Sequence, residues 1–340
     1  HQVRNDNSSD QVQESVRLKV GRKMKKRVLV TGATGFIGRA LSIELAGAGY
    51  EVVALSRRRV EAEKLFAGGV KVVEWDAVTA GQWSELLDGA LAIVNLAGDN
   101  IAAGRWTEKK KRQILESRLN AGKAVTEAIR SAERRPQVLI QASGVGCYGD
   151  RGDEPLDENS SNGTGFIADV ARQWEGSVGE VEALGVRLAT MRLGVVLGPH
   201  GGVMSRLIPP FRFFAGGHPG SGKQWLPWVH LNDVTAIVRF LIESADCEGP
   251  FNVTVPDPTR SKDFYNLLGK AMHRPAFFPM PAFALKLALG EMATELLLPS
   301  TRALPKKLLE AGYEFTFPDP AAAFSDILKA SGAKNHTLHS

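Results

Sequence analysis

Three glycines, Gly32, Gly35 and Gly38, follow a short β-branched run and stand at GxxGxxG spacing in the segment TGATGFIG. Glycines at such a turn permit the tight bend, let a phosphate approach the backbone, and let the next helix pack closely against the strand. The helix then presents free N–H groups and its positive dipole end to the phosphates. We therefore predict a dinucleotide site here, the alternative being a purely structural turn; the same turn supplies Thr34, Phe36 and Ile37.

The residues that choose between NAD and NADP are expected about twenty residues further on, at the end of the second strand. The chain reads ALSRRR there, with Ser56, Arg57 and Arg58 where an acid would bind the ribose 2′-OH of NAD. A carboxylate would repel a 2′-phosphate, whereas a hydroxyl and a guanidinium bind it through charge-assisted hydrogen bonds. The segment predicts NADP(H), with a solvated turn as the alternative for at least one of the three arginines.

Two further strand ends are predicted to line the cofactor. Asp76 ends the third strand in EWD, where it either faces the adenine edge or caps the next turn. The fourth strand ends in NLAG, and small residues are expected where backbone passes close to a cofactor. This stretch contributes Leu96, Ala97 and Gly98.

These residues require a scaffold of alternating strands and helices, and the chain supplies one from Arg27 onward. Short β-branched runs alternate with helical segments: RVLV, FIGRALSIELAG, EVVALS, VEAEKLF and KVVEWD. That alternation indicates consecutive βαβ units. Further strands are expected at 187–197 and 251–255, and a long helix from about Thr107 to Arg134.

We therefore predict an α/β fold, a Rossmann-type doubly wound parallel sheet with a smaller C-terminal substrate lobe. The NADP-binding domain is predicted over 24–200, with a return of the chain at about 227–255. The smaller lobe takes 201–226 and 256–340. Residues 1–23 are expected to form a disordered extension.

Composition excludes several functional classes for this chain of 340 residues. Its formal net charge is +5, and residues 1–27 hold eight basic against three acidic residues, so the remainder is balanced. No basic face is indicated, and we predict no nucleic-acid partner.

The two cysteines and seven histidines show neither disulfide nor metal-ligand spacing. No apolar run reaches the roughly 18 residues of a spanning helix, so no membrane partner is predicted. The predicted location is the cytoplasm, with an organelle stroma or matrix as the alternative.

Several separated motifs resemble the short-chain dehydrogenase/reductase superfamily, in its atypical branch known as epimerase family proteins and sometimes called cell-division-inhibitor-like. They are NLAGDNIAAGRW, ESRLNAGKAV, ASGVGCYGD, RLGVVLGPHGG, GGHPGSGKQWLPWVHLND and LEAGYEF. The resemblance spans residues 26 to about 328. It implies that Arg118 reaches towards NADP(H) and that Val196 lies near the nicotinamide half. For Arg118, a surface salt bridge with Glu116 or another acid is the alternative.

The chain departs from this superfamily in its expected chemistry. Catalytic members use a Tyr and a Lys at YxxxK, with a Ser from the fifth strand, to exchange a proton with the substrate. Counting back from Glu175, which matches a glutamate of related epimerases, these positions hold Ile167 and Ala171. A shift by one residue gives Phe166 and Val170, which supply no phenol or amine either.

Two nearby residues are the candidate substitutes for the missing pair. Ser143 and Tyr148 lie in ASGVGCYG at the end of the fifth strand. The alternatives are a strand-end hydrogen-bonding role for Ser143 and a shaping role for Tyr148 in the substrate site.

Substrate contacts are expected from loops at the carboxyl ends of the strands. The candidates are Asn100, Arg105, Trp106, Gln224 and Trp225. An arginine beside a tryptophan either holds an anionic or aromatic substrate or packs a loop. In WVHLND, His230 and Asp233 are expected to fix a strand-to-helix junction, with Asn232 or Asp233 as the N-cap.

Two functions follow. The first is an NADP(H)-dependent oxidoreductase or epimerase of an unidentified small molecule, without the usual tyrosine–lysine pair. The second is a non-catalytic NADP(H)-binding protein that senses redox state or supports a protein partner, in line with the cell-division name.

Overall fold

A seven-stranded, fully parallel sheet forms the centre of the computed structural model, which describes residues 26–66 and 68–333. The strand order is β11-β7-β5-β4-β1-β2-β3. The strands are β1 (Arg27–Thr31), β2 (Glu51–Ser56), β3 (Val70–Glu74), β4 (Ala92–Asn95), β5 (Val138–Gly144), β7 (Arg187–Leu193) and β11 (Gly249–Val253). The chain steps outward from β1 in both directions, which confirms the predicted Rossmann-type doubly wound sheet.

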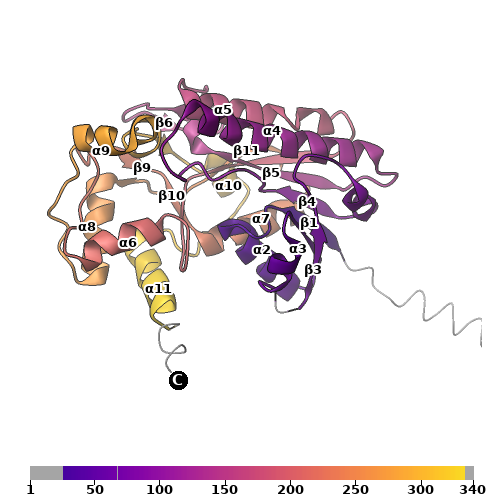
Figure 1. Ribbon diagram of the computed structural model, residues 1–340, viewed down its shortest axis with the longest axis horizontal. Coiled ribbons are helices and arrows are strands. Elements are labelled where there is room, and N and C mark those ends of the chain that lie inside the picture. The colour runs from indigo at the N-terminus through magenta and orange to yellow at the C-terminus, as the bar shows by residue number, and fades with distance from the viewer. Residues whose placement is uncertain (1–25, 67, 334–340) are drawn as a thin grey trace, which may run out of the picture.

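Helices cover both faces of this sheet, with α4 and α5 above it and α2 and α7 below it in Figure 1. Their bounds are α2 (Phe36–Gly47), α3 (Arg59–Glu63), α4 (Glu108–Ser131), α5 (Phe166–Gly176) and α7 (Leu231–Glu243). Alternate residues of β1 serve the two faces: Val28 and Val30 join the core beneath α2 and α7, and Leu29 joins the core beneath α4. Burial on both faces explains why these strands are continuously apolar.

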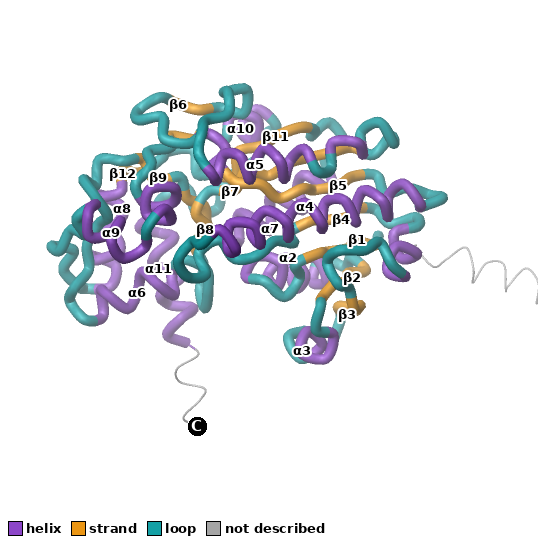
Figure 2. The backbone as a smooth tube through the Cα atoms, turned by 45° about the horizontal axis from the view of Figure 1, so that its top comes forward, coloured by secondary structure: helices purple, strands orange, loops and turns teal. Residues whose placement is uncertain are grey.

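A smaller lobe lies past the carboxyl ends of the strands, at the left of Figure 1 and Figure 2. Its helices are α6 (Met204–Arg212), α8 (Ser261–Met272), α9 (Ala282–Leu289) and α11 (Pro320–Ala333), and α10 (Lys306–Glu310) packs near β11. Phe211, Phe264 and Phe324 belong to a separate core in this lobe. Short strand pairs are β9 (Trp225–Leu226) with β12 (Thr259–Arg260), and β6 (Pro155–Leu156) with β13 (Arg302–Ala303). The remaining turns of helix are η1 (Gln82–Leu87), η2 (Val145–Tyr148), η3 (Gly179–Val181) and the π-helix η4 (Ala293–Leu297).

The sequence predicts one strand over 187–197, but the structure divides it at Gly194. Beyond β7, β8 (Val195–Leu197) leaves the central sheet and pairs with β10 (Trp228–His230). A Cβ on Gly194 would lie 2.8 Å from the carbonyl oxygen of Pro227, so this close approach requires glycine. The division carries Val196 away from β7 towards the start of the smaller lobe.

The expected N-cap of α7 is wrong. His230, not Asn232 or Asp233, is the cap: its Nδ1 accepts the N–H of Asn232 at 3.2 Å. Asp233 is fully buried and its carboxylate instead accepts the N–H groups of Thr316 and Phe317 at 2.8 and 3.0 Å. His230 thus fixes the junction between β10 and α7, while Asp233 anchors the segment directly after LEAGYEF.

The predicted domain boundaries remain predictions, although β11 does join the large sheet within the segment where a return was expected. The extension predicted for residues 1–23 lies outside the described residues. Within 26–66 and 68–333, no helix is long and apolar enough to cross a bilayer.

Candidate functional site

In the glycine turn, the backbones of β1, α2 and the end of β4 approach one another closely. Gly32 has φ 62°, and a Cβ there would lie 2.7 Å from the carbonyl oxygen of Leu96. A Cβ on Gly38 would lie only 2.3 Å from the carbonyl oxygen of Gly32. Larger residues at these two positions would force apart β1, α2 and the end of β4.

Helix α2 begins at this turn with free donors. Its N-cap, Gly35, has no side chain to cap the helix, and the N–H groups of Phe36 and Ile37 meet no acceptor among the described residues. The ring of Phe36 is enclosed by the turn after β8, since Cβ atoms on Gly198 and Gly202 would lie 2.9 and 2.6 Å from it. The helix start is thus held in place and open to an anion.

A buried chain of polar side chains supports the neighbouring strand ends. Thr31 Oγ1 donates to Asn95 Oδ1 at 2.7 Å and accepts the N–H groups of Leu96 and Ala97 at 3.0 and 3.1 Å. Asn95 Nδ2 donates to Gln141 Oε1 at 2.9 Å. Thr31, Asn95 and Gln141 are fully buried. They fix the backbone of the NLAG stretch beside the glycine turn.

The arginine turn after β2 leaves two guanidinium groups in solvent. Ser56 is buried, and its Oγ accepts the N–H of Arg58 at 3.2 Å. Arg57 and Arg58 are exposed, and neither forms an ion pair with a carboxylate of the described residues. Arg59 instead pairs with Glu63 at 2.8 Å. The solvated-turn alternative therefore suits Arg59, while Arg57 and Arg58 remain available to an anion.

Asp76 caps the turn that follows β3. Its Oδ1 accepts the N–H groups of Val78 and Thr79, each at 2.8 Å, and these bonds lower the pKa of the carboxyl. The carboxylate thus performs the capping role given above as an alternative. Its contact with the adenine edge remains a prediction.

Arg118 is buried beneath the NLAG stretch, which contradicts the surface salt bridge with Glu116. One terminal nitrogen donates to the carbonyl oxygens of Asp99 and Ile114 at 3.1 and 2.8 Å, and the guanidinium lies 4.7 Å from the ring centre of Trp174. Burial lowers the pKa of Arg118 to about 10. A Cβ on Gly98 would lie 3.1 Å from the guanidinium carbon. A larger residue at position 98 would therefore displace the Arg118 side chain.

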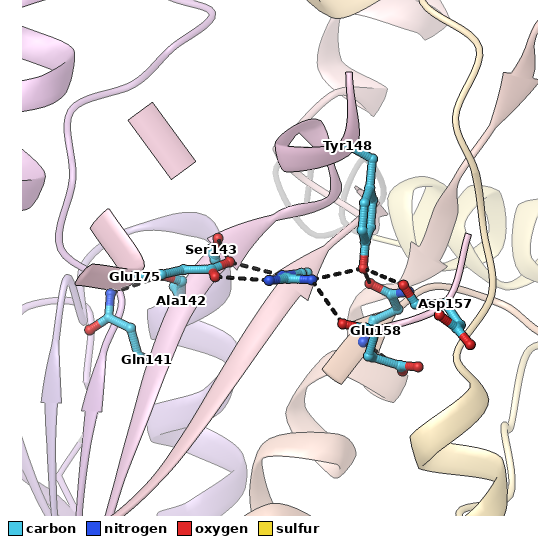
Figure 3. A network of polar contacts seen from close by, with 9 residues as sticks. Gln141, Ala142, Ser143, Tyr148, Asp157, Glu158 and Glu175 are labelled. Atoms are coloured by element: carbon cyan, nitrogen blue, oxygen red, sulfur yellow. Dashed lines mark hydrogen bonds and ion pairs between the residues drawn. The ribbon is translucent and has the colours of Figure 1, made fainter. Parts of the chain in front are cut away.

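An ion pair joins α5 to the central sheet (Figure 3). Arg192 on β7 holds both carboxylate oxygens of Glu175, with N–O distances of 3.0 Å each. The hydroxyl of Ser143 on β5 donates to Glu175 Oε1 at 2.7 Å. The arginine side chain is 9% exposed and that of Glu175 is 20% exposed. Glu175 is therefore occupied in positioning α5 against β5 and β7.

The same arginine continues the network to Tyr148. Arg192 donates to the phenol oxygen at 3.0 Å, and that phenol donates to Asn252 Oδ1 at 2.8 Å and lies 3.0 Å from the Asp157 carbonyl oxygen. Figure 3 shows Tyr148 pointing from η2 into this network, across from the side occupied by Ser143. The network links β5, β7 and β11 beneath the candidate site.

This geometry argues against the acid/base role predicted for Tyr148. The side chain is fully buried, and burial raises the pKa of its phenol to about 12. Ser143 is 3% exposed, and its hydroxyl proton points at Glu175. Its contacts match the strand-end hydrogen-bonding alternative. On α5, Ile167 is half-buried against η2 and Ala171 is buried.

The predicted substrate residues divide between two settings. In the loop after β4, Asn100 and Arg105 are exposed, while Trp106 donates to the carbonyl oxygen of Ile101 at 2.7 Å and packs edge-on against Phe166. Trp106 therefore packs the loop. Val196 is half-buried against the core beneath α7.

Gln224 and Trp225 belong to the interior contacts of the smaller lobe. Gln224 is buried and its amide donates to the carbonyl oxygen of Pro219 at 2.8 Å. The Trp225 ring lies near two guanidinium groups, those of Arg260 and Arg302, at 4.0 and 4.9 Å. Among the described residues, no hydrogen bond joins Gln224 to the loop after β4.

The segment around η4 joins the smaller lobe to the edge of the site. Glu295 Oε2 accepts the N–H of Ile167 in the first turn of α5 at 3.1 Å. Glu291 forms an ion pair with Lys111 at the start of α4 at 3.0 Å. A Cβ on Gly290 would lie 3.5 Å from the guanidinium of Arg105. Sequence reasoning missed these contacts because the two carboxylates lie more than a hundred residues from their partners.

Comparisons with known proteins agree with this arrangement. Residues 28–254 match the family model described as NAD dependent epimerase/dehydratase family, and residues 280–327 match a domain of unknown function, DUF1731. "Epimerase family protein YfhF" of Bacillus subtilis is 39% identical over 304 residues, which cover 88% of this chain and 97% of that protein. "Epimerase family protein SDR39U1 homolog, chloroplastic" of Arabidopsis thaliana is 38% identical, over 85% of this chain and 83% of that protein.

A solved structure supports the same assignment. The crystal structure of human epimerase family protein SDR39U1 (isoform2) with NADPH has a TM-score of 0.80 and 32% identity, and the match covers 89% of this chain and 99% of that one. The family model alone spans well over half of the sequence. This chain therefore belongs to the NAD dependent epimerase/dehydratase family, in the atypical short-chain dehydrogenase/reductase branch.

Proposed function

We propose that this chain binds NADP(H) in preference to NAD(H). The observation that carries the proposal is the turn after β2, where Arg57 and Arg58 are exposed beside Ser56 and have no carboxylate partner in the described chain. Two guanidinium groups and a hydroxyl suit the dianionic 2′-phosphate. The human relative whose structure was solved with NADPH supports the same choice.

The rest of the site fits the cofactor. The free N–H groups at the start of α2 suit a pyrophosphate, and the crowded Cβ positions at Gly32 and Gly38 show that backbones meet here with no room for side chains. Leu96, Ala97 and Gly98 would lie along the cofactor, with Thr34 in the turn and Val196 towards the nicotinamide half. Arg118 would support this stretch from below through its bond to the Asp99 carbonyl oxygen.

Bound NADP(H) supplies hydride transfer, and the protein must then provide or remove a proton for most carbonyl chemistry. Counting back from Glu175, Ile167 and Ala171 occupy the positions of the Tyr and Lys that transfer protons in catalytic members. Tyr148 and Ser143 are buried and already hydrogen-bonded. This arrangement favours a cofactor-binding protein that responds to redox state over an enzyme with side-chain acid/base catalysis.

A second function is an oxidoreductase or epimerase acting on an unidentified small molecule. The observation that favours it is the contact of the smaller lobe with α4 and α5 through Glu291 and Glu295. A second lobe over the edge of the sheet is typical of an enclosed substrate site. Arg105 and Asn100 are then the proposed substrate contacts, since both remain exposed there.

The cytoplasm remains the proposed location, and the relative named as chloroplastic makes an organelle the alternative. A protein partner is proposed only with the redox-sensing function.

Tyr148→Phe tests whether the phenol has a structural role, as we propose, or takes part in proton transfer. Loss of the phenol oxygen removes the bond to Asn252 and a partner of Arg192, so we expect the free energy of unfolding to fall by about 1–3 kcal/mol. The Kd for NADPH, measured by calorimetry, should stay within about twofold of wild type because no role in binding is assigned to the phenol. Any NADPH oxidation measured with a panel of aldehydes and ketones should persist.

Tyr265→Phe is the matched control, since Tyr265 is also buried but its hydroxyl forms no hydrogen bond with the described residues. Its effect on the free energy of unfolding should be below about 0.5 kcal/mol. If Tyr148→Phe abolished turnover while leaving the fold and the NADPH affinity intact, Tyr148 would be an acid/base residue after all. Equal wild-type affinity for NADPH and NADH would contradict the proposed cofactor preference.

A further inference from the structure

Seven large apolar side chains are exposed in the smaller lobe. They follow α6, precede α9, or lie on α9, and together we call them the aromatic patch: Phe213, Phe214, Phe277, Phe278, Met280, Phe283 and Leu287. Phe213 and Phe277 are each 81% exposed. Single exposed apolar residues are common, but a cluster of this kind marks an interaction surface.

Backbone hydrogen bonds hold the parts of the aromatic patch side by side. The N–H of Phe278 donates to the carbonyl oxygen of Gly216 at 3.1 Å, and that of Met280 donates to the carbonyl oxygen of His218 at 2.9 Å. The segment after α6 is thereby paired with the segment that leads into α9. Figure 1 and Figure 2 place α6, α8 and α9 at the same end of the molecule.

Helix α9 has two large apolar side chains that the described chain leaves largely uncovered. Its sequence is AFALKLAL, but Leu285 is its only buried residue. Phe283 and Leu287 lie one turn apart on the same side and are 74% and 78% exposed. The helix therefore presents an apolar stripe to its surroundings.

The two chain segments that carry the aromatic patch hold charges of a single sign. Residues 200–223 and 264–290 contain no Asp or Glu. Their lysines and arginines are Arg206, Arg212, Lys223, Lys270, Arg274 and Lys286. None of these six forms an ion pair with a carboxylate in the described part of the chain. Arg274 instead lies 4.6 Å from the ring centre of Phe214.

Exposed aromatic side chains together with unpaired cations distinguish three candidate partners: a second copy of the chain, an acidic protein and an anionic bilayer. A symmetric pair of copies would place the same cationic patch against itself, which like charges oppose. Phe213, Phe277 and Phe283 project with about three quarters or more of their surface exposed, and an acidic protein would have to supply a matching pocket for each of them. An anionic bilayer satisfies both features, because apolar side chains enter the acyl boundary while cationic groups meet the lipid phosphates.

We propose that the aromatic patch docks this protein on an anionic membrane surface. Lys286 lies between Phe283 and Leu287 in the α9 sequence, and its ammonium can extend to the lipid phosphates while the apolar neighbours insert. Attachment is peripheral, since no helix of 26–66 and 68–333 could span a bilayer. The inference goes beyond the proposed cofactor function, does not depend on it, and departs from the expectation of no membrane partner.

Vesicle flotation tests the proposal with the full-length protein and phosphatidylcholine vesicles with or without phosphatidylglycerol. We expect the protein to float with the phosphatidylglycerol vesicles and to be released as salt screens the lysines and arginines. The double variant Phe277→Ser/Phe283→Ser should reduce the bound fraction at least about tenfold. Both side chains are exposed, so the variant should keep the wild-type melting temperature and NADPH affinity.

Ile43→Ser is the matched control, because Ile43 is 51% exposed on α2, away from the aromatic patch. It should bind vesicles like the wild type. Failure to float with phosphatidylglycerol vesicles, or equal flotation of the double variant, would overturn the proposal. A dimer in sedimentation velocity that Phe277→Ser/Phe283→Ser dissociates would overturn it in favour of a second copy as the occupant.

Discussion

Replacing Arg57 by alanine is expected to raise the Kd for NADPH by about 10- to 100-fold, and the Kd for NADH by less than about threefold. The guanidinium is exposed beside Ser56 and has no carboxylate partner among the described residues, so it is free to bind the 2′-phosphate as proposed. NADH carries a hydroxyl at that position and gains nothing from the charge. Calorimetric titration with each cofactor measures the two changes.

The chain offers a control two residues away. Arg59 forms an ion pair with Glu63 at 2.8 Å, so Arg59→Ala removes the same net charge without removing a free guanidinium. Its effect on the Kd for NADPH should be small, about threefold or less, and should fall with salt. Equal losses for NADPH and NADH in Arg57→Ala would rule out its assignment to the 2′-phosphate.

Replacing Arg192 by methionine is expected to lower the free energy of unfolding by about 2–4 kcal/mol. Burial lowers the pKa of Arg192, but its hydrogen bonds to Glu175 outweigh that effect and raise the pKa above its usual value. Loss of the cation leaves a largely buried carboxylate unpaired and removes a donor to Tyr148. Chemical denaturation at neutral pH measures the change.

A matched control lies on the outer side of α5, the helix that carries Glu175. Arg172 pairs with Asp169 at 2.7 Å, but both side chains are more than half exposed, so Arg172→Ala should cost about 0.5 kcal/mol or less. The double variant Arg192→Met/Glu175→Met should be more stable than Arg192→Met, because no buried charge is left alone. A double variant less stable than Arg192→Met would show that the ion pair does not act as a unit.

The sequence predicts the doubly wound sheet and the turn at Gly32, Gly35 and Gly38 because the periodicity of apolar residues and the spacing of glycines can be read within short segments of the chain. The supporting chain of Thr31, Asn95 and Gln141 is assembled from three strands. Its only sequence signal is a polar residue near the end of each otherwise apolar run. Such residues are also common at strand ends without any contact between them, so their hydrogen bonds required the structure.

Tyr148 shows why residue type alone misleads at this site. It is the only tyrosine near the end of the fifth strand, but η2 turns its ring towards β7 and β11, where Arg192 and Asn252 occupy the phenol. The sequence separation from Asn252 is 104 residues, which no local pattern bridges. Arg118 is a similar case: the sequence left a cofactor contact and a surface salt bridge open, and the structure shows the guanidinium buried against Trp174 and bonded to the Asp99 carbonyl oxygen.

A crystal structure of the NADPH complex tests the central claim most directly, through the side chains near nicotinamide C4. We expect the 2′-phosphate to contact Arg57 or Arg58 and the space beside C4 to be bordered by Ile167 and other apolar groups. No Tyr, His, Lys, Cys or carboxylate side chain should lie within hydrogen-bond distance, about 3.2 Å, of a substrate oxygen placed there. A protonatable side chain at that distance, or a 2′-phosphate directed away from both arginines, would contradict the account.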